Sequence, residues 1–280
     1  MKTDVCVRWR AGRASWRPAV ELFEASAFEV ASIPDDTTAR AFVVPAHYSH
    51  SFPAARRRFG LYTRGALVGC AVFSAPTRAA VLRPWTMADA VELGRLVLLD
   101  EVPGNAESWF VARCFEELRA DGFAGVVSFS DPEPRTDASG VVTFVGHIGT
   151  VYQALGAIYT GRGSEKTQHL FADGTEFPNR AASKLRGLER GHRAVVEALV
   201  AHGAAAPSCG ADLHAWMIGE LARLTRTHRH RGNHRYAWGL TPGARRDLAR
   251  STPALTYPKF NSRACRVAPT ANTTCTTRPS

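Results

Sequence analysis

The sequence predicts a mixed α/β fold (α+β), in which a central mixed sheet is flanked by helices. Short apolar runs typical of strands are interspersed with a segment whose apolar residues recur at three- and four-residue steps. The 280 residues are 45% hydrophobic and 21% charged, which excludes a wholly disordered or fibrous chain. No run of about 18 apolar residues occurs, so no membrane span is expected. A chain of this length can bury a sizeable core.

The N-terminal part is expected to contribute elements to the same domain as the rest. Residues 4–10 are typical of a strand, and the stretch around 18–27 is typical of a helix. A polar stretch follows at 34–40. Residues 58–65 and 66–76 then predict two strands joined by an Arg-Gly turn.

A strand, a tight loop and a helix come next. They are predicted over residues 84–102, 103–108 and 109–122, with Ser108 as the N-cap of the helix. The free N–H groups and the dipole of a first helical turn favour an anion, and Gly104 lets a phosphate approach the backbone. The alternative is an ordinary strand-to-helix turn.

A second apolar strand is predicted at 123–132, where it ends in Asp131-Pro132. The later elements are expected to be a loop, a short helix, a strand and two helices, over residues 133–147, 148–157, 157–163, 181–204 and 213–229. The chain is expected to be loosely ordered after about residue 262.

The charge balance points to a polyanionic partner. The net charge is +10, and 31 of the 35 basic residues are Arg, whose fork binds phosphate in two places. Residues 223–250 hold eight Arg and three His against one acid, with Tyr236 and Trp238 among them, and predict a basic helical C-terminal extension. Nucleic acid is favoured over a membrane. A GC-rich genome would explain the use of Arg over Lys, but not the excess of positive charge.

The six cysteines include no C-x-x-C pair, and the N-terminus has no apolar signal-peptide core. Reduced thiols and a cytoplasmic location are therefore expected.

The order strand, loop, helix, strand, then Tyr-x-x-Leu-Gly-Ala and a returning strand resembles the core of the Gcn5-related N-acetyltransferases. In that family, acyl-coenzyme A lies between two splayed parallel strands, with its pyrophosphate on the loop. The loop of this chain, PGNAES, is shorter than the usual family loop and carries an acid. The resemblance implies an acetyl-CoA site at Leu96, Val97, Leu98, Leu99, Gly104, Asn105, Ala106, Glu107 and Ser108.

A narrower resemblance rests on a set of strings along the chain. They are PAHYSHSFP (45–53), FGLYTRGALVGCAVFSAP (59–76), ELGRLVLLDEVPGNAESWF (92–110), GVVSFSDPEPR (125–135), GHIGTVYQALGAIYTG (146–161) and HRGNHRYAW (230–238). As a set they resemble the Mom family of bacteriophages, whose members modify DNA on an acetyltransferase-like fold. On this basis residues 42–240 form the catalytic domain with its basic segment. Residues 1–41 belong to the same domain, and 241–280 form a partly disordered extension.

The resemblance implies that adenine in double-stranded DNA is converted to N6-carbamoylmethyl adenine, which protects phage DNA from host restriction endonucleases in the bacterial cytoplasm. Acetyl-CoA is implied as a cofactor, and Fe(II) has been proposed for the family. His47 and Asp131 are weak candidates for metal ligands, and no H-x-D or H-E-x-x-H spacing supports a metal.

Four residues are expected to carry the chemistry: His47, Asp131, Tyr152 and Tyr62. His47 suits a base or a metal ligand, and Asp131 would orient the adenine amine or accept its proton. Tyr152 would donate a proton to the coenzyme thiolate or position the substrate. The alternatives are a surface or helix-capping His, an Asp-Pro turn and a core aromatic. Strand alternation leaves open whether Tyr62 faces the core or the site. His147 is a weaker candidate for binding the base or a metal.

Adenine N6 in a duplex is expected to be reached by extruding the base. The residues expected to bind the nucleic acid are Tyr48, Arg56, Arg57, Arg58, Arg229, Arg231, His234, Arg235 and Trp238. Two other functions remain open from the sequence. One is a conventional acetyl-CoA-dependent N-acetyltransferase acting on a protein or small-molecule amine. The other is a DNA-binding protein without enzymatic activity, which would not bind coenzyme A.

Overall fold

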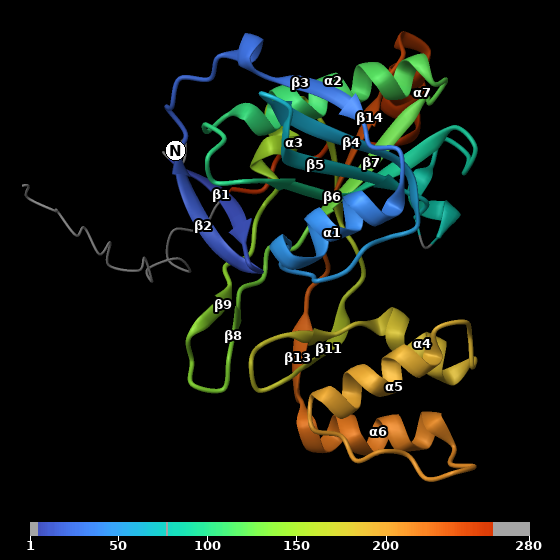
Figure 1. Ribbon diagram of the computed structural model, residues 1–280. Helices are drawn as coiled ribbons and strands as arrows, with labels where there is room; N and C mark the ends of the chain where they lie inside the picture. Colours follow the sequence, from blue (N-terminus) through green and yellow to red (C-terminus); the bar gives the residue numbers. More distant parts are fainter. Residues whose placement is uncertain (1–4, 77, 260–280) are drawn as a thin grey trace, which may run out of the picture.

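The computed structural model describes residues 5–76 and 78–259, and its centre is a seven-stranded sheet in the order β10-β14-β7-β6-β5-β4-β3 (Figure 1). The strands are β3 (Glu29–Ser32), β4 (Ala55–Thr63), β5 (Ala66–Ser74), β6 (Ala90–Leu98), β7 (Gly125–Ser130), β10 (Ile158–Arg162) and β14 (His234–Gly239). The loose order expected after residue 262 falls outside the described residues. No helix of the described part is long and apolar enough to cross a membrane.

Helices cover both faces of this sheet. The helices are α1 (Asp36–Ala46), α2 (Ala106–Ala120), α3 (Thr150–Ala154) and α7 (Pro242–Ser251). Side chains alternate across β14: Tyr236 and Trp238 pack in the core formed with α2 and α3, whereas Ala237 packs with Leu248 of α7. Val43 of α1 packs on the same side of the sheet as α7, in a separate cluster with β5 and β6. The mixed α/β architecture predicted from the sequence is confirmed.

The two parallel strands separate partway along their length. β6 and β7 pair in parallel, while the other neighbours in the sheet pair antiparallel. Their pairing ends at Leu93 and Ser128, and β6 runs on to Leu98 without β7 beside it. Gly94 is an extra residue opposite β5, a bulge that bends β6 at the point of separation. The splayed parallel strands expected of an acetyltransferase-like fold are therefore present.

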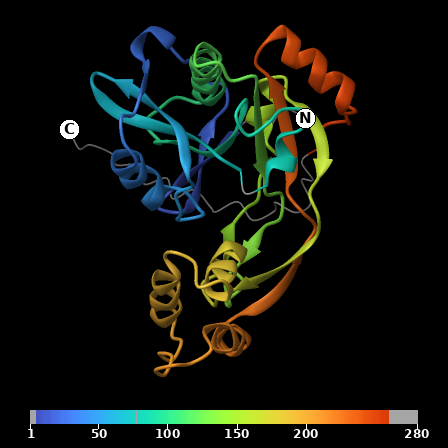
Figure 2. The same cartoon turned by 90° about the vertical axis from the view of Figure 1, so that its right-hand side faces the viewer.

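A long insert occupies residues 163–233, between β10 and β14. It contains β11 (Lys166–Leu170), β12 (Glu176–Phe177), β13 (Arg226–His230), α4 (Asn179–Arg186), α5 (His192–Ala201) and α6 (Leu213–Leu224). Figures 1 and 2 place it at one end of the sheet, reached through β11 and β13. It has a hydrophobic cluster of its own: Phe171, Phe177, Leu185, Val195, Leu199, Ala204, Met217 and Leu221.

Two hairpins lie beside the sheet. The N-terminal hairpin consists of β1 (Val5–Arg10) and β2 (Arg13–Pro18), and the second of β8 (Arg135–Thr136) and β9 (Val142–Phe144). Short 3-10 helices, η1 (Ala25–Ala27) and η2 (Ala79–Leu82), complete the described elements.

Several predicted boundaries were wrong. The helix predicted around 18–27 is reduced to η1, and the polar stretch at 34–40 leads into α1, which is capped by Asp35. The strand predicted from residue 84 begins at Ala90, and α2 begins before Ser108, with Asn105 as its N-cap. The predicted loop 133–147 contains the β8–β9 hairpin. The helix predicted over 181–204 is broken into α4 and α5, and that over 213–229 ends at Leu224, because the next residues pair with β11.

Candidate active site and its cleft

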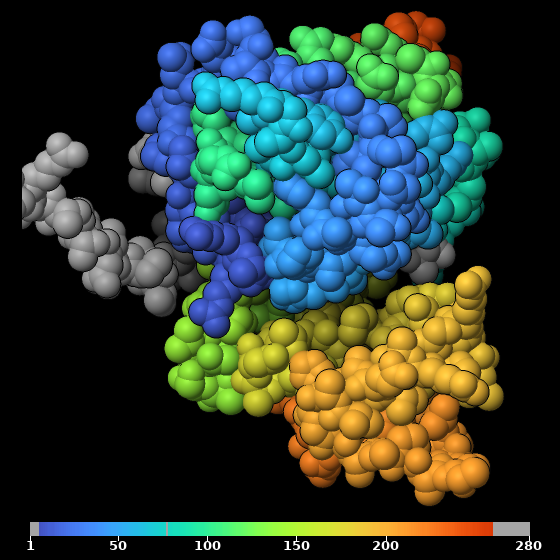
Figure 3. Space-filling view, viewed as in Figure 1, coloured from blue at the N-terminus to red at the C-terminus, as the bar shows by residue number. Residues whose placement is uncertain are grey.

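A cleft of about 1220 Å³ lies between the insert and the core. Its walls come from the segment after α1 (Tyr48 to Phe52), the β8–β9 hairpin, and α4 and α5 of the insert. Figure 3 shows the seam where α1, in blue, faces the insert, in yellow and orange. Asp131 and Arg135 line this cleft. The space is of the size that holds a small-molecule ligand or an extruded nucleotide.

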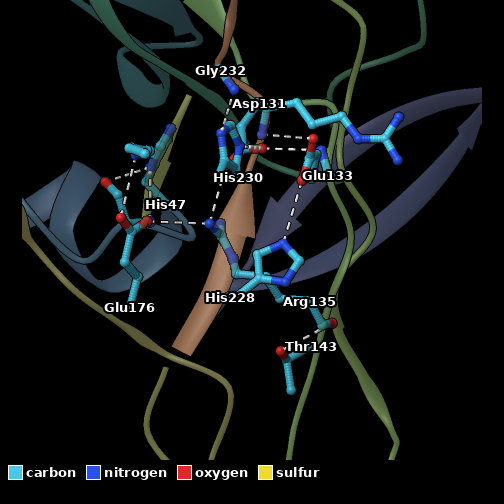
Figure 4. A network of polar contacts seen from close by, with 12 residues as sticks. His47, Asp131, Glu133, Arg135, Thr143, Glu176, His228, His230 and Gly232 are labelled. Atoms are coloured by element: carbon cyan, nitrogen blue, oxygen red, sulfur yellow. Dashed lines mark hydrogen bonds and ion pairs between the residues drawn. The ribbon is translucent and has the colours of Figure 1, made fainter. Parts of the chain in front are cut away.

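Asp131 follows the carboxyl end of β7 and is held by three donors (Figure 4). His230 Nε2 donates to Oδ1 at 2.8 Å, as does the Glu133 amide at 3.0 Å, and an Arg135 N–H donates to Oδ2 at 3.0 Å. Burial alone would raise the pKa of Asp131, but the His230 hydrogen bond and the Arg135 charge lower it to about 2. Asp131 is therefore a fixed, ionised acceptor at neutral pH.

His230 reaches Asp131 from the last strand of the insert and is completely buried. The Gly232 amide donates to its Nδ1 at 2.9 Å. Since Nδ1 accepts, the ring proton lies on Nε2 and is donated to the carboxylate. Gly232 has a φ of 92° and packs against the Gly163 backbone, so the turn that aims this amide requires glycine.

Arg135 joins the core to the insert. Besides Asp131 it contacts Glu176 of β12 at 3.3 Å, and its guanidinium lies 4.1 Å from the centre of the Phe144 ring. Glu176 in turn pairs with Lys166 of β11. Arg135 therefore links Asp131 in the core to Glu176 in the insert by two ion pairs.

An aromatic wall lies next to this carboxylate. The Tyr48 ring lies 4.5 Å from Phe144 and 4.2 Å from His47, and Trp9 of β1 stacks on Phe144 at 5.2 Å. Burial raises the pKa of the Tyr48 hydroxyl, so it stays protonated and can donate a hydrogen bond. The His147 ring lies at the edges of Tyr48 and Tyr152, at 6.3 and 6.5 Å.

His47 caps the C-terminus of α1, where its amide donates to Val43 O at 2.9 Å. Its Nδ1 accepts from the Ser49 amide at 3.1 Å, which leaves the ring proton on Nε2. Burial, with the Arg95 charge, lowers the pKa of His47 well below its ordinary value. His47 is therefore a neutral imidazole at neutral pH.

Charged groups also lie where β6 leaves β7. Arg95 donates to Ser51 O and Ser51 Oγ at 3.0 and 2.7 Å, and within the described residues it makes no ion pair. Burial raises the pKa of Glu92, which lies three residues before Arg95 in β6. Neither Arg95 nor Glu92 was predicted to belong to the site.

The structure brings together His47, Tyr48, Asp131, Tyr152 and His147. The His147 amide donates to the Asp131 backbone carbonyl at 2.7 Å, so these two residues are in direct contact. Tyr62 lies elsewhere: it is on β4, three strands from β7, and its pKa is raised by burial and then by the nearby Cys70 and Glu29. Three strand spacings amount to about 14 Å.

The predicted nucleic-acid contacts divide into two groups. Arg229 and Arg231 are exposed on and just after β13, next to His230. Trp238 is buried in the main core, and His234 is buried against the Tyr159 hydroxyl at 2.8 Å, so neither ring is free to stack on a base. Arg235 is partly buried and donates to Thr160.

Arg56, Arg57 and Arg58 do not lie beside Asp131. Their side chains contact Met87 O, Asp121 and Asp36, two of which precede the amino ends of β6 and β7. Asp131 follows the opposite, carboxyl end of β7. These three residues, expected to bind the nucleic acid, therefore do not lie beside the candidate site.

The structure shows what surrounds the residues assigned to the two implied cofactors. The loop before α2 is covered by the N-terminal hairpin, and Glu107 is buried against Arg8. Among the described residues no three His, Cys, Asp or Glu side chains gather as a metal site. The oxygens of Asp131 are already engaged by three donors.

His230 and Arg135 were not predicted to belong to the site, because the sequence signal for a role of either residue is weak. His230 directly follows the helix predicted over 213–229 and ends a His-Arg-His string whose alternation also suits a strand. Arg135 is four residues after Asp131, in a stretch expected to be a loop.

Several solved acetyltransferases are similar to this chain. An N-acetyltransferase from Staphylococcus aureus Mu50 has a TM-score of 0.30 and 13% identity, covering 66% of this chain and 68% of its own. YhbS from Escherichia coli, solved with CoA, has a TM-score of 0.33 and 15% identity, covering 49% and 72%. The ribosomal-protein-S18-alanine N-acetyltransferase from Escherichia coli has a TM-score of 0.33 and 13% identity, covering 53% and 88%.

No curated protein matches the chain in sequence. The model of the Mom protein family matches residues 27–259, which include the splayed strands, the insert and Asp131. The chain therefore belongs to the Mom family.

Proposed function

We propose that this protein converts adenine in double-stranded DNA to N6-carbamoylmethyl adenine, and so protects bacteriophage DNA from restriction endonucleases in the cytoplasm of the bacterial host. The observation that carries the proposal is the ionised Asp131, held by three donors in the wall of a cleft of about 1220 Å³. Membership of the Mom family supports the choice of substrate.

The cleft suits an extruded base. Base-modifying enzymes take the target nucleotide out of the stack and read its edge with hydrogen bonds. Tyr48, which is partly exposed, lines the cleft with Asp131 and lies in the aromatic wall beside its carboxylate. The adenine would therefore enter from the seam between insert and core.

Asp131 is suited to hold the amine rather than to remove its proton. A carboxylate has about four acceptor positions, and His230, Arg135 and the Glu133 amide use three of them. The remaining position would accept a hydrogen bond from the adenine N6 amine and so fix the orientation of the base in the cleft. With a pKa of about 2, Asp131 is a weak base at neutral pH and is suited to orient the amine.

The basic surface near the site supplies contacts to the duplex. Arg229 and Arg231 flank His230, so their exposed guanidiniums lie near the residue that holds Asp131. Arg side chains bind phosphates, and the affinity then falls as salt rises. Acetyl-CoA and Fe(II) are implied by the family resemblance alone, and no step is assigned to either group.

The test is mass spectrometry of nucleosides from plasmid DNA of cells that express the protein. Wild-type protein is expected to produce a deoxyadenosine species heavier by one carbamoylmethyl group, and Asp131→Asn to abolish it. Asp247→Asn is the matched control, because Asp247 is an exposed residue of α7 paired with Arg250. Unmodified adenine from folded wild-type protein would contradict the proposal, and full modification by Asp131→Asn would contradict the role of Asp131.

A further inference from the structure

The loop between β6 and α2 has the shape of an anion site, but two of its amides, those of Gly104 and Asn105, are already engaged. The Gly104 amide donates to Glu21 Oε2 at 2.7 Å, and this hydrogen bond lowers the pKa of Glu21. The next amide, of Asn105, hydrogen-bonds the Cys6 sulfur of β1, where burial raises the thiol pKa. Both partners belong to the N-terminal segment, about 80 to 100 residues away in the chain.

Arg8 of β1 also binds the N-terminal segment to the loop. It is 3% exposed, and its guanidinium donates to Glu107 Oε1 at 2.8 Å and to Leu99 O at 2.9 Å. Further N–H groups donate to the carbonyls of Val102 and Pro103. A buried guanidinium with this many acceptors is both satisfied and immobile. None of its nitrogens is left without an acceptor.

Backbone contact closes the remaining space over the loop. A Cβ on Gly104 would overlap the carbonyl oxygen of Pro18, and the Asn105 amide side chain donates to Ala19 O. The chain from β2 to Glu21 therefore lies directly on the glycine that would admit a phosphate.

We infer that residues 5–21 occupy the coenzyme position of this fold, with the Glu21 carboxylate in place of a diphosphate, so that the loop before α2 does not bind coenzyme A. A diphosphate at the loop would lie near Glu21 and the buried Glu107, and four of the five N–H groups of Arg8 already donate to other acceptors. Like charges without a free cation disfavour the ligand.

The hairpin also contributes to the candidate site. Successive side chains of β1 point to opposite faces, so Arg8 faces the loop while Trp9 packs against Phe144 and Tyr48. The segment that closes the loop thus completes the aromatic wall beside Asp131. It lies before residue 27, where the match to the family model begins.

Hydrogen exchange of the full-length protein, with and without coenzyme A at millimolar concentration, tests the inference. We expect the exchange of residues 99–108 to be unchanged by the ligand, even if the ligand binds elsewhere. Saturable protection of 99–108, together with faster exchange of 5–21, would overturn the inference, because the coenzyme would then displace the segment.

A pair of variants tests the role of the carboxylate. Glu21→Gln removes the charge that the Gly104 amide binds, and should raise the exchange of residues 5–21 roughly tenfold. Glu24→Gln, at an exposed residue of the same stretch that contacts Ser26, should leave it unchanged. Unchanged β5 exchange shows that both variants are folded, and equal exchange of 5–21 in the two would also overturn the inference. Adenine modification is measured separately, so either proposal can fail alone.

Discussion

The side chain with most control over Asp131 is His230, which contributes no atom to the cleft lining but fixes the charge of the carboxylate. His230→Phe removes a donor to a buried anion, which corresponds to about 1.5–3 kcal/mol. The pKa of Asp131 should therefore rise by about one to two units, measured by ¹³C NMR of the Asp carboxyl groups. Adenine modification should fall with it, and His230→Gln, which restores a donor, should recover part of both.

The control for that experiment lies two residues earlier. His228 faces Glu133 at 3.3 Å and does not touch Asp131, so His228→Phe should leave the pKa of Asp131 in place. An unchanged Asp131 pKa in His230→Phe would show that the His230 hydrogen bond does not hold the carboxylate ionised.

Some residues of the candidate site could be predicted from the sequence and others could not. His47, Tyr48, Asp131 and Tyr152 lie in short motifs, so the family resemblance identified them. His230 could not be paired with Asp131 in advance, because the two are 99 residues apart and only the return of the insert joins them. Arg56, Arg57 and Arg58 were expected to bind the nucleic acid, but their ion pairs and backbone acceptors lie at the other end of the sheet from Asp131.

At the scale of elements, the β6–α2 loop depends on a glycine for its contact with the N-terminal segment. Gly104→Ala places a methyl group against the Pro18 carbonyl, so the two backbones must separate. Overpacking of this kind costs about 1–3 kcal/mol, which should lower the melting temperature by several degrees. Gly219→Ala is the contrasting substitution, because its methyl group meets open space on α6 and should stabilise the protein by up to about 1 kcal/mol. Equal melting temperatures for the two variants would contradict the close contact at Gly104.

Elements with strong local patterns were predicted well, and those decided by distant pairing were not. α2 follows from its apolar spacing, and β4 and β5 from the turn between them. β13 was predicted as helix, since its pairing with β11 is formed across the whole of α4 to α6. The stretch at 18–27 was also predicted as helix, but only η1 is helical, and the hydrogen bond from the Gly104 amide to Glu21 holds this part of the chain against the loop.

At the scale of the whole molecule, buried neutral histidines make the fold sensitive to acid. Burial lowers the pKa values of His147 and His234 to about 4, and that of His47 well below its ordinary value. The unfolded chain binds protons at these groups from about pH 6.5 downward, whereas the folded chain does not until its own lower pKa values are reached. The contribution of these histidines to the free energy of unfolding is therefore complete above about pH 6.5 and is lost as pH falls toward 4.

Protonation of His147 should make the protein less stable in acid. For His147 alone, a folded pKa of about 4 implies a loss on the order of 2 kcal/mol between neutral pH and pH 5. Urea unfolding should show stability falling over that interval, and His147→Gln, which cannot take up the proton, should show a shallower fall from a lower starting value. The same slope in both proteins would mean that His147 is not held neutral, and the aromatic contacts to Tyr48 and Tyr152 would then not exclude its charged form.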